Sequence, residues 1–117
     1  MDIESLRHYC MNLSGVEETL PFGPDTLVYK VAGKIFALTG LDEVECSVNL
    51  KCDPDKAIEL REEYPDQIFP GYHMNKRHWN TVFFERGLPD KFLISLIDHS
   101  YNLVVAALPA KLREQLQ

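Results

Sequence analysis

Residues 67–84, QIFPGYHMNKRHWNTVFF, decide the fold. Two aromatic-rich runs flank the segment MNKR at 74–77, and this pattern predicts two paired strands joined by a cationic turn. With a two- or four-residue connection, the predicted register places Ile68, Tyr72, Trp79 and Phe83 on one face, and His73, His78, Phe69, Val82 and Phe84 on the other. Both faces are largely apolar, so one is expected to lie against helices and the other to need cover or a partner. A slip of one residue would exchange the two faces throughout.

The N-terminal half predicts a helix followed by strands. Residues 2–13 have helical apolar spacing and Asp2 as a candidate N-cap. Residues 16–25 predict an ordered loop. Residues 27–31 and 35–39 are β-rich runs around Gly33, which can adopt the positive φ of a tight hairpin.

The rest of the chain adds a third strand and the remaining helices. Residues 44–50 alternate in polarity, as a strand does. Asp53 and Pro54 then open a second helix as N-cap and first helical residue. The longest apolar helical pattern begins at Pro89, and Pro109 ends it and starts a short helical tail.

The predicted order is therefore α-β-β-β-α-β-β-α. Short links between strands favour an antiparallel sheet with helices on one face, which is a two-layer α+β sandwich. At 117 residues the chain fits a single domain covering 1–117, with no internal repeat or linker.

Composition predicts a cytoplasmic protein. No apolar run is long enough to span a bilayer, and the charged N-terminus lacks the apolar stretch of a signal peptide. Cys10, Cys46 and Cys52 are odd in number and lack CxxC spacing, so free thiols are expected. The net charge of −6 is unfavourable for a protein that coats a polyanion.

No pattern of residues indicates catalysis, a metal or a cofactor. The chain lacks GxSxG, P-loop, GxGxxG and HExxH signatures. Asp98, His99 and Ser100 are consecutive, and neighbours on a helix point in different directions, so they do not form a triad. His73 and His78 would face each other on the hairpin, but no further ligand has a fixed spacing.

Basic residues mark the tips of both predicted hairpins. Lys30 and Lys34 bracket one tip, and Lys76 and Arg77 lie on the other with His78 beside them. Such tips can lay positive charge against phosphates. Lysines at turns also serve solubility and protect sheet edges, so this pattern leaves both interpretations open.

The chain resembles the MmcQ/YjbR family of small bacterial proteins. The resemblance rests on residues 71–82 (GYHMNKRHWNTV), 100–104 (SYNLV), 108–113 (LPAKLR), 20–23 (LPFG) and 29–37 (YKVAGKIFA). It covers essentially the whole chain. Ala110 departs from the pattern, which has a second lysine beside Lys111.

The resemblance implies a five-stranded antiparallel sheet and a double-wing mode of DNA binding, in which two hairpins embrace the duplex. The leading hypothesis is therefore a non-catalytic nucleic-acid-binding protein. Its predicted contacts are Lys76, Arg77, Lys30 and Lys34, with Asn75, His78 and Trp79 as secondary contacts.

Two rival hypotheses remain. One is a protein-interaction adaptor, or a homodimer, that docks through the aromatic hairpin face. The other is a small-ligand-binding protein or an enzyme with a pocket near Tyr72, His73, His78 and Trp79. An architectural role for His73, Asn75, Trp79 and Tyr101 is a further alternative.

Overall fold

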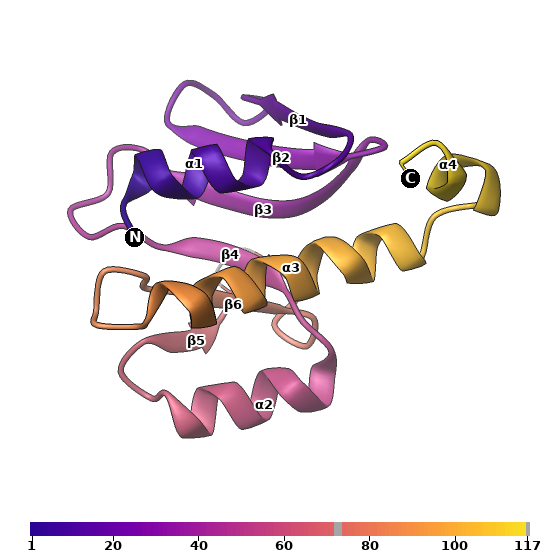
Figure 1. The fold of residues 1–117 in the computed structure, drawn as a ribbon. Helices are drawn as coiled ribbons and strands as arrows, with labels where there is room; N and C mark the ends of the chain where they lie inside the picture. Colours follow the sequence, from indigo (N-terminus) through magenta and orange to yellow (C-terminus); the bar gives the residue numbers. More distant parts are fainter. Residues whose placement is uncertain (72–73, 117) are drawn as a thin grey trace.

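A six-stranded antiparallel sheet with helices on one face forms the protein, as the computed structural model shows for residues 1–71 and 74–116 (Figure 1). The elements in chain order are α1 (Ile3–Met11), β1 (Val16–Thr19), β2 (Thr26–Val31), β3 (Lys34–Gly40), β4 (Val48–Lys51), α2 (Pro54–Glu63), β5 (Ile68–Pro70), β6 (Trp79–Val82), α3 (Asp90–Ala106) and α4 (Ala110–Glu114). The strand order in the sheet is β1-β2-β3-β4-β6-β5. The α+β class with an antiparallel sheet is confirmed.

Local capping explains where the helices begin. The Asp2 carboxylate accepts a hydrogen bond from the Ser5 N–H at 2.8 Å, and the Asp53 carboxylate accepts one from the Lys56 N–H at 3.3 Å. Both caps satisfy N–H groups that have no partner within the helix. Pro89 occupies the N-cap position of α3, as its missing N–H allows.

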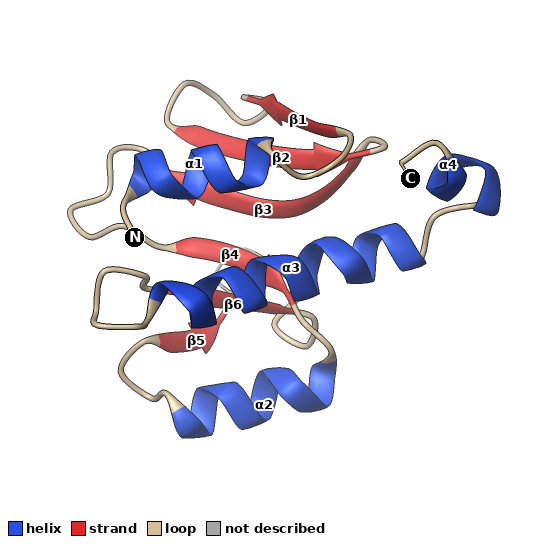
Figure 2. Cartoon of the chain, in the orientation of Figure 1, coloured by secondary structure: helices blue, strands red, loops and turns tan. Residues whose placement is uncertain are grey.

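Helices α1 and α3 cover one face of the sheet, and the core lies between them and the strands (Figure 2). The largest side chains with no exposed surface come from β2 and β3, where Tyr29 and Phe36 lie. The Phe36 ring meets the Tyr101 ring of α3 edge-on, with 5.4 Å between ring centroids. Helix α2 packs beside β5 at the edge of the sheet and buries Ala57 and Leu60.

The predicted loop 16–25 was wrong in its first part, because Val16–Thr19 forms the edge strand β1 and the sheet has six strands instead of five. The sequence VEET lacks the apolar alternation of a strand, since Glu18 occupies a position on the helix-covered face. Its carboxylate accepts hydrogen bonds from Arg7 at 2.8 and 2.9 Å and from the Tyr29 hydroxyl at 3.0 Å. A partly buried carboxylate is tolerated there because it is paired.

The predicted register of the aromatic hairpin was wrong by one residue. Ile68 pairs with Val82 and Phe69 with Thr81, because the connection is longer than the two or four residues assumed. Strand β5 ends at Pro70 and β6 begins at Trp79. Ile68 and Val82 therefore share the buried face. The predicted positions of Tyr72 and His73 lie outside the described residues.

The third predicted strand begins later than expected. Strand β4 starts at Val48, and the preceding segment 41–47 is a loop in which Val44 is fully exposed. The turn between β2 and β3 is as predicted, with Gly33 at φ 78° and Ala32 at φ 49°.

Candidate nucleic-acid interface

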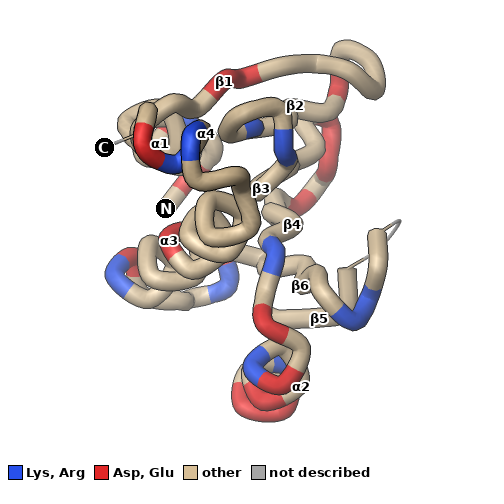
Figure 3. Tube along the Cα trace, turned by 90° about the vertical axis from the view of Figure 1, so that its right-hand side faces the viewer, with Lys and Arg blue, Asp and Glu red and all other residues tan. Residues whose placement is uncertain are grey.

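Both basic turns lie at the same end of the sheet. The register places Val31 opposite Lys34, Ala37 opposite Leu50, and Lys51 opposite Trp79. The β2–β3 turn, the end of β4 and the start of β6 are therefore neighbours. Figure 3 looks onto this end, where blue segments mark Lys and Arg.

Helix α4 joins the same end. The Ser14 hydroxyl donates a hydrogen bond to the Leu116 carbonyl at 2.7 Å, and the Tyr101 hydroxyl donates one to the Ser14 carbonyl at 2.5 Å. Ser14 lies just before Val16, which pairs with Val31 beside the β2–β3 turn. We call this surface the basic end and define it by its cationic residues Lys30, Lys34, Lys51, Lys76, Arg77, Lys111 and Arg113.

The cations of the basic end are open to an incoming anion. Lys34, Lys76 and Arg77 are exposed, and Lys30 is half-exposed. Within the described part of the chain, the three ion pairs are Met1–Asp90, Arg7–Glu18 and Arg86–Glu45, and none involves the basic end. Carboxylates are nevertheless close: Glu17 lies opposite Lys30 across the β1–β2 ladder, and Asp53 and Asp55 begin α2.

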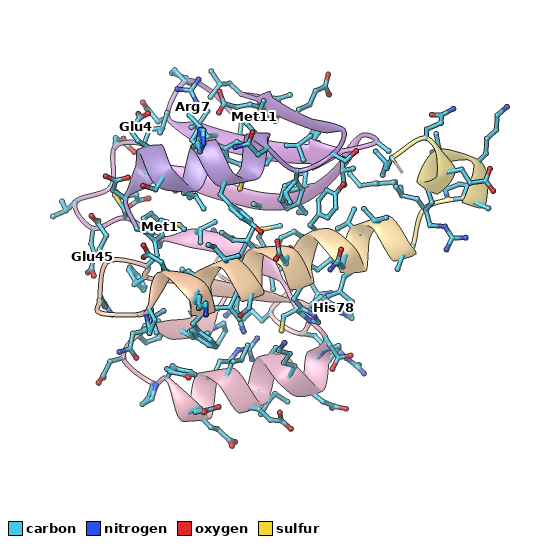
Figure 4. The ribbon with its side chains drawn as sticks, viewed as in Figure 1. Met1, Glu4, Arg7, Met11, Glu45 and His78 are labelled. Atoms are coloured by element: carbon cyan, nitrogen blue, oxygen red, sulfur yellow. The ribbon has the colours of Figure 1, made fainter. Side chains whose placement is uncertain are left out.

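The opposite end of the molecule is acidic. Thr26 pairs with Gly40 there, so the loops that carry Asp25, Asp42, Glu43 and Glu45 meet at that end. In Figure 4, Glu45 lies at the left edge of the molecule and His78 lies well to the right of it.

Arg86, although close in sequence to the aromatic hairpin, belongs to the acidic end. Its guanidinium donates hydrogen bonds to the Glu45 carboxylate at 2.5 and 2.8 Å and lies 4.0 Å from the centroid of the Phe83 ring. The Arg86 side chain lowers the pKa of Glu45, so this pair stays ionised. Arg86 is therefore engaged by the protein itself.

The connection between β5 and β6 is shaped by its own side chains. The Asn75 side-chain oxygen accepts a hydrogen bond from the Arg77 N–H at 2.9 Å, and its carbonyl accepts one from the His78 N–H at 3.1 Å. The His78 carbonyl accepts a hydrogen bond from the Cys52 N–H at 2.7 Å. Asn75 and His78 thus hold the loop that presents Lys76 and Arg77.

Arg61 of α2 anchors the same loop from below. Its guanidinium donates hydrogen bonds to the Asn80 side-chain oxygen at 2.7 Å, to the Trp79 carbonyl at 3.3 Å and to the Lys76 carbonyl. Lys76, Arg77 and Arg61 line an open cleft of about 440 Å³ against the first turns of α2. Asp55 also lines it, so the cleft is not purely cationic.

Four consecutive residues of α3 tie the helix to four different parts of the fold, which confirms that Asp98, His99 and Ser100 do not act together. Asp98 accepts a hydrogen bond from Tyr9 at 2.5 Å, and His99 accepts one from the Asp53 N–H at 3.2 Å. Ser100 bonds to β3 and β4, and Tyr101 to the loop before β1. These side chains stabilise the fold. They reach different partners because neighbouring residues on a helix point in different directions.

His99 makes stability depend on pH. Burial and the nearby Lys56 lower the His99 pKa from its ordinary 6.5, and Asp53 opposes this shift. The folded state therefore binds fewer protons than the unfolded state, and the stability held by neutral His99 is lost as pH falls below about 6.5. We expect the urea midpoint to fall between about pH 7 and pH 5.5. In H99Q this fall should be smaller, whereas in H8Q, which changes an exposed histidine of α1, it should persist.

Sequence reasoning missed Lys51 as a member of the basic end and undervalued Lys111 and Arg113. Lys51 ends strand β4, and the neighbouring strand β6 begins at the basic β5–β6 connection. Recognising that Lys51 lies there requires the order of the strands in the sheet. Lys111 and Arg113 lie in a short helix after Pro109, and contacts of Ser14 and Gly15 with Leu116 bring that helix to the basic end.

The thiols are not activated. Burial raises the pKa of Cys10 to about 12 and that of Cys52 to about 11. Across residues 1–71 and 74–116, His, Cys, Asp and Glu side chains form no group of three that could hold a metal ion. In the same residues no helix has the length and apolar character needed to cross a membrane.

Comparisons with known proteins agree with one another. A family model described as YjbR matches residues 11–103. The uncharacterized protein YbdF of Escherichia coli O157:H7 is 41% identical over 105 residues, which cover 90% of this chain and 85% of YbdF. The uncharacterized protein YjbR of Escherichia coli K12 is 35% identical over 116 residues, which cover 99% of this chain and 98% of YjbR.

A solved structure agrees with the fold. The crystal structure of Deinococcus radiodurans protein DR2400, described as a DUF419 domain, has a TM-score of 0.91 and 37% identity. The match covers 97% of this chain and 86% of that one.

Proposed function

This chain belongs to the YjbR family, and on that premise we propose that it binds nucleic acid through the basic end. The protein is a binding protein, and the β2–β3 turn and the β5–β6 connection are its two wings. Lys76 and Arg77 contact phosphates from one wing, and Lys30 and Lys34 from the other. Asn75, His78 and Trp79 hold or extend the first wing.

The observation that carries the proposal is the shared end of the two basic turns. Strands β3 and β6 are separated only by β4, so their ends at the basic end lie about 10 Å apart at the usual strand spacing. Two cationic turns at that separation can touch phosphates on one nucleic acid at the same time. Phosphate contacts of this kind position a protein without reading sequence.

The separation of basic and acidic residues between the two ends of the molecule also supports binding through the basic end. The chain has a net charge of −6, which repels a polyanion overall. Because Asp25, Asp42 and Glu43 lie at the far end of the sheet, that repulsion turns the basic end toward the nucleic acid. Binding should therefore be modest in affinity and should weaken as salt rises.

Charge reversal at one exposed lysine tests the proposal. K34E reverses a charge at the basic end, whereas K91E reverses an exposed charge at the start of α3, away from it. In fluorescence anisotropy with a labelled duplex at low salt, we expect K34E to weaken binding about tenfold. K91E should bind like the parent protein, and the K76E/R77E double variant should bind more weakly than K34E.

Single-stranded DNA of the same sequence and a second, higher salt concentration complete the experiment. Absence of binding at low salt would overturn the proposal, as would equal binding by K34E, K76E/R77E and K91E. Weaker binding by K91E alone would also overturn it, because the contact would then lie elsewhere.

The adaptor hypothesis finds less support in the geometry. The aromatic surface that it requires includes Phe69 and Phe83, whose rings pack edge-to-face with centroids 5.6 Å apart. Arg86 lies over both rings, and both side chains are half-buried. This part of the aromatic face is therefore already covered by the chain's own arginine.

A further inference from the structure

The face of the sheet opposite α1 and α3 carries a pocket of about 370 Å³. Ile35 and Leu38 of β3 form its floor, and Phe22 and Met74 line it from two separate loops. This volume falls within the range of small-molecule sites. The pocket is separate from the basic end in its residues, since no lysine or arginine of the described chain lines it.

Polar groups from two strands and one loop line the same pocket. Thr26, Ser47 and Asn49 line it. Among the described residues, the hydroxyls of Thr26 and Ser47 make no hydrogen bond. The Asn49 side-chain oxygen accepts a hydrogen bond from Thr81 at 2.5 Å, which leaves the Asn49 amino group as a donor. An apolar floor with a few oriented polar groups is the usual construction of a ligand site.

Glu43 supplies the one charged group among the described residues that line the pocket. Its side chain folds over Gly40 at the end of β3. A Cβ added at Gly40 would meet the Glu43 Cγ at 2.7 Å and its Oε1 at 2.9 Å. The absence of a side chain at residue 40 therefore lets the carboxylate lie against the strand and line the pocket.

Phe22 completes the site from the loop between β1 and β2. Its side chain is 67% exposed, so it contributes little to the core. An aromatic ring and a carboxylate that line the same pocket suit a ligand with both an apolar body and a positive charge, since each group attracts a cation.

We propose that this pocket binds a small organic amine, with its apolar body between Phe22, Leu38 and Met74 and its ammonium group at Glu43. The ammonium group donates hydrogen bonds to the Glu43 carboxylate and to the hydroxyl oxygens of Thr26 or Ser47. A carboxylate ligand is disfavoured because it would meet the Glu43 charge with no cation to offset it. This site is independent of the proposed nucleic-acid contact.

Three probes with the same phenyl body and different head groups test the proposal. They are 2-phenylethylamine, 2-phenylethanol and 3-phenylpropanoate, each titrated into the full chain and followed by ¹⁵N–¹H NMR. We expect the amine to shift the amide signals of Leu38, Gly40 and Asn49 and to bind about tenfold more tightly than the alcohol. The carboxylate should bind more weakly than the alcohol.

Two variants separate the charge of Glu43 from its position. E43Q removes the charge, and its matched control D42N removes a neighbouring exposed charge that does not line the pocket. G40A keeps the charge but displaces the Glu43 side chain, because the added Cβ would meet its Cγ at 2.7 Å and its Oε1 at 2.9 Å. We expect E43Q and G40A, but not D42N, to reduce amine binding to the level of the alcohol.

Three results would overturn the proposal: no shift at these amides with millimolar amine, equal binding of the three probes, or equal amine affinity in E43Q and the parent protein. A melting-temperature measurement on E43Q and G40A checks that both variants remain folded. Because K34E leaves this pocket intact, loss of nucleic-acid binding and loss of amine binding are distinguished by separate variants.

Discussion

Replacing Ser100 by alanine is expected to lower the free energy of unfolding by about 2–4 kcal/mol. The Ser100 hydroxyl donates a hydrogen bond to the Phe36 carbonyl at 2.5 Å and accepts one from the Lys51 N–H at 2.9 Å. Ser100 has no exposed surface, so alanine would remove the hydroxyl that pairs with the buried Phe36 carbonyl and with the partly buried Lys51 N–H.

The position of Ser100 explains why a hydroxyl is needed there. The β3–β4 ladder runs from Thr39 opposite Val48 to Ala37 opposite Leu50, and the β2–β3 register shifts beside Phe36. The bulge interrupts regular pairing, and the hydroxyl of α3 bridges the two strands at the point where the ladder stops. Ser100 therefore joins the long helix to the middle of the sheet.

Urea unfolding of S100A measures this effect, and S95A is the matched control. Ser95 lies on the same helix but is exposed, and its hydroxyl donates only to the Phe92 carbonyl of the same helix. We expect S95A to change stability by less than about 0.5 kcal/mol. Similar midpoints for S100A and S95A would contradict the bridging role.

Replacing Arg61 by alanine is expected to cost about 2–3 kcal/mol and to release the loop that carries Lys76 and Arg77. Asn80 is only 2% exposed, and without the guanidinium its side-chain oxygen would lose the 2.7 Å hydrogen bond from Arg61. The carbonyls of Lys76 and Trp79 would lose their hydrogen bonds from the same group. One side chain thus holds the loop that carries Lys76 and Arg77 and supports the sheet.

R61K separates charge from geometry, because lysine cannot reproduce the planar fork of donors. We expect R61K to recover only part of the stability lost in R61A. E62A, which changes an exposed neighbour on α2, should have little effect. Full recovery by R61K would show that charge alone holds the loop, contrary to this account.

The parts of the fold that depend on local interactions could be predicted from the sequence. Asp2 and Asp53 cap α1 and α2 through side chains three residues from their partners, and Gly33 makes the β2–β3 turn. These interactions need no knowledge of distant residues. They can therefore be predicted from short stretches of sequence.

The parts that depend on distant partners could not be predicted in the same way. Strand β1 exists because Glu18 meets Arg7 and Tyr29, which are separated from it by 11 residues in either direction. The one-residue error in the aromatic hairpin arose because its connection is anchored by Arg61 instead of being a tight turn. Such tertiary contacts override the local pattern.

In the candidate site, too, the local features could be predicted from the sequence and the arrangement in space could not. Lys30, Lys34, Lys76 and Arg77 stand at turns, where sequence alone indicated exposed charge. Their meeting at one end required the strand order, since β4 lies between β3 and β6. The open-face pocket joins Phe22 to Met74, and no sequence pattern links those two residues.

The most direct test is to map the contact with a short DNA duplex by ¹⁵N–¹H NMR at low salt. We expect the amide shifts to gather at the basic end, in the β2–β3 turn with Lys34, around Lys76 and Arg77, and in α4. We expect none in the acidic loop around Asp42 and Glu43. Shifts centred on that acidic loop or on the open face around Leu38, or no shifts at all, would contradict this expectation.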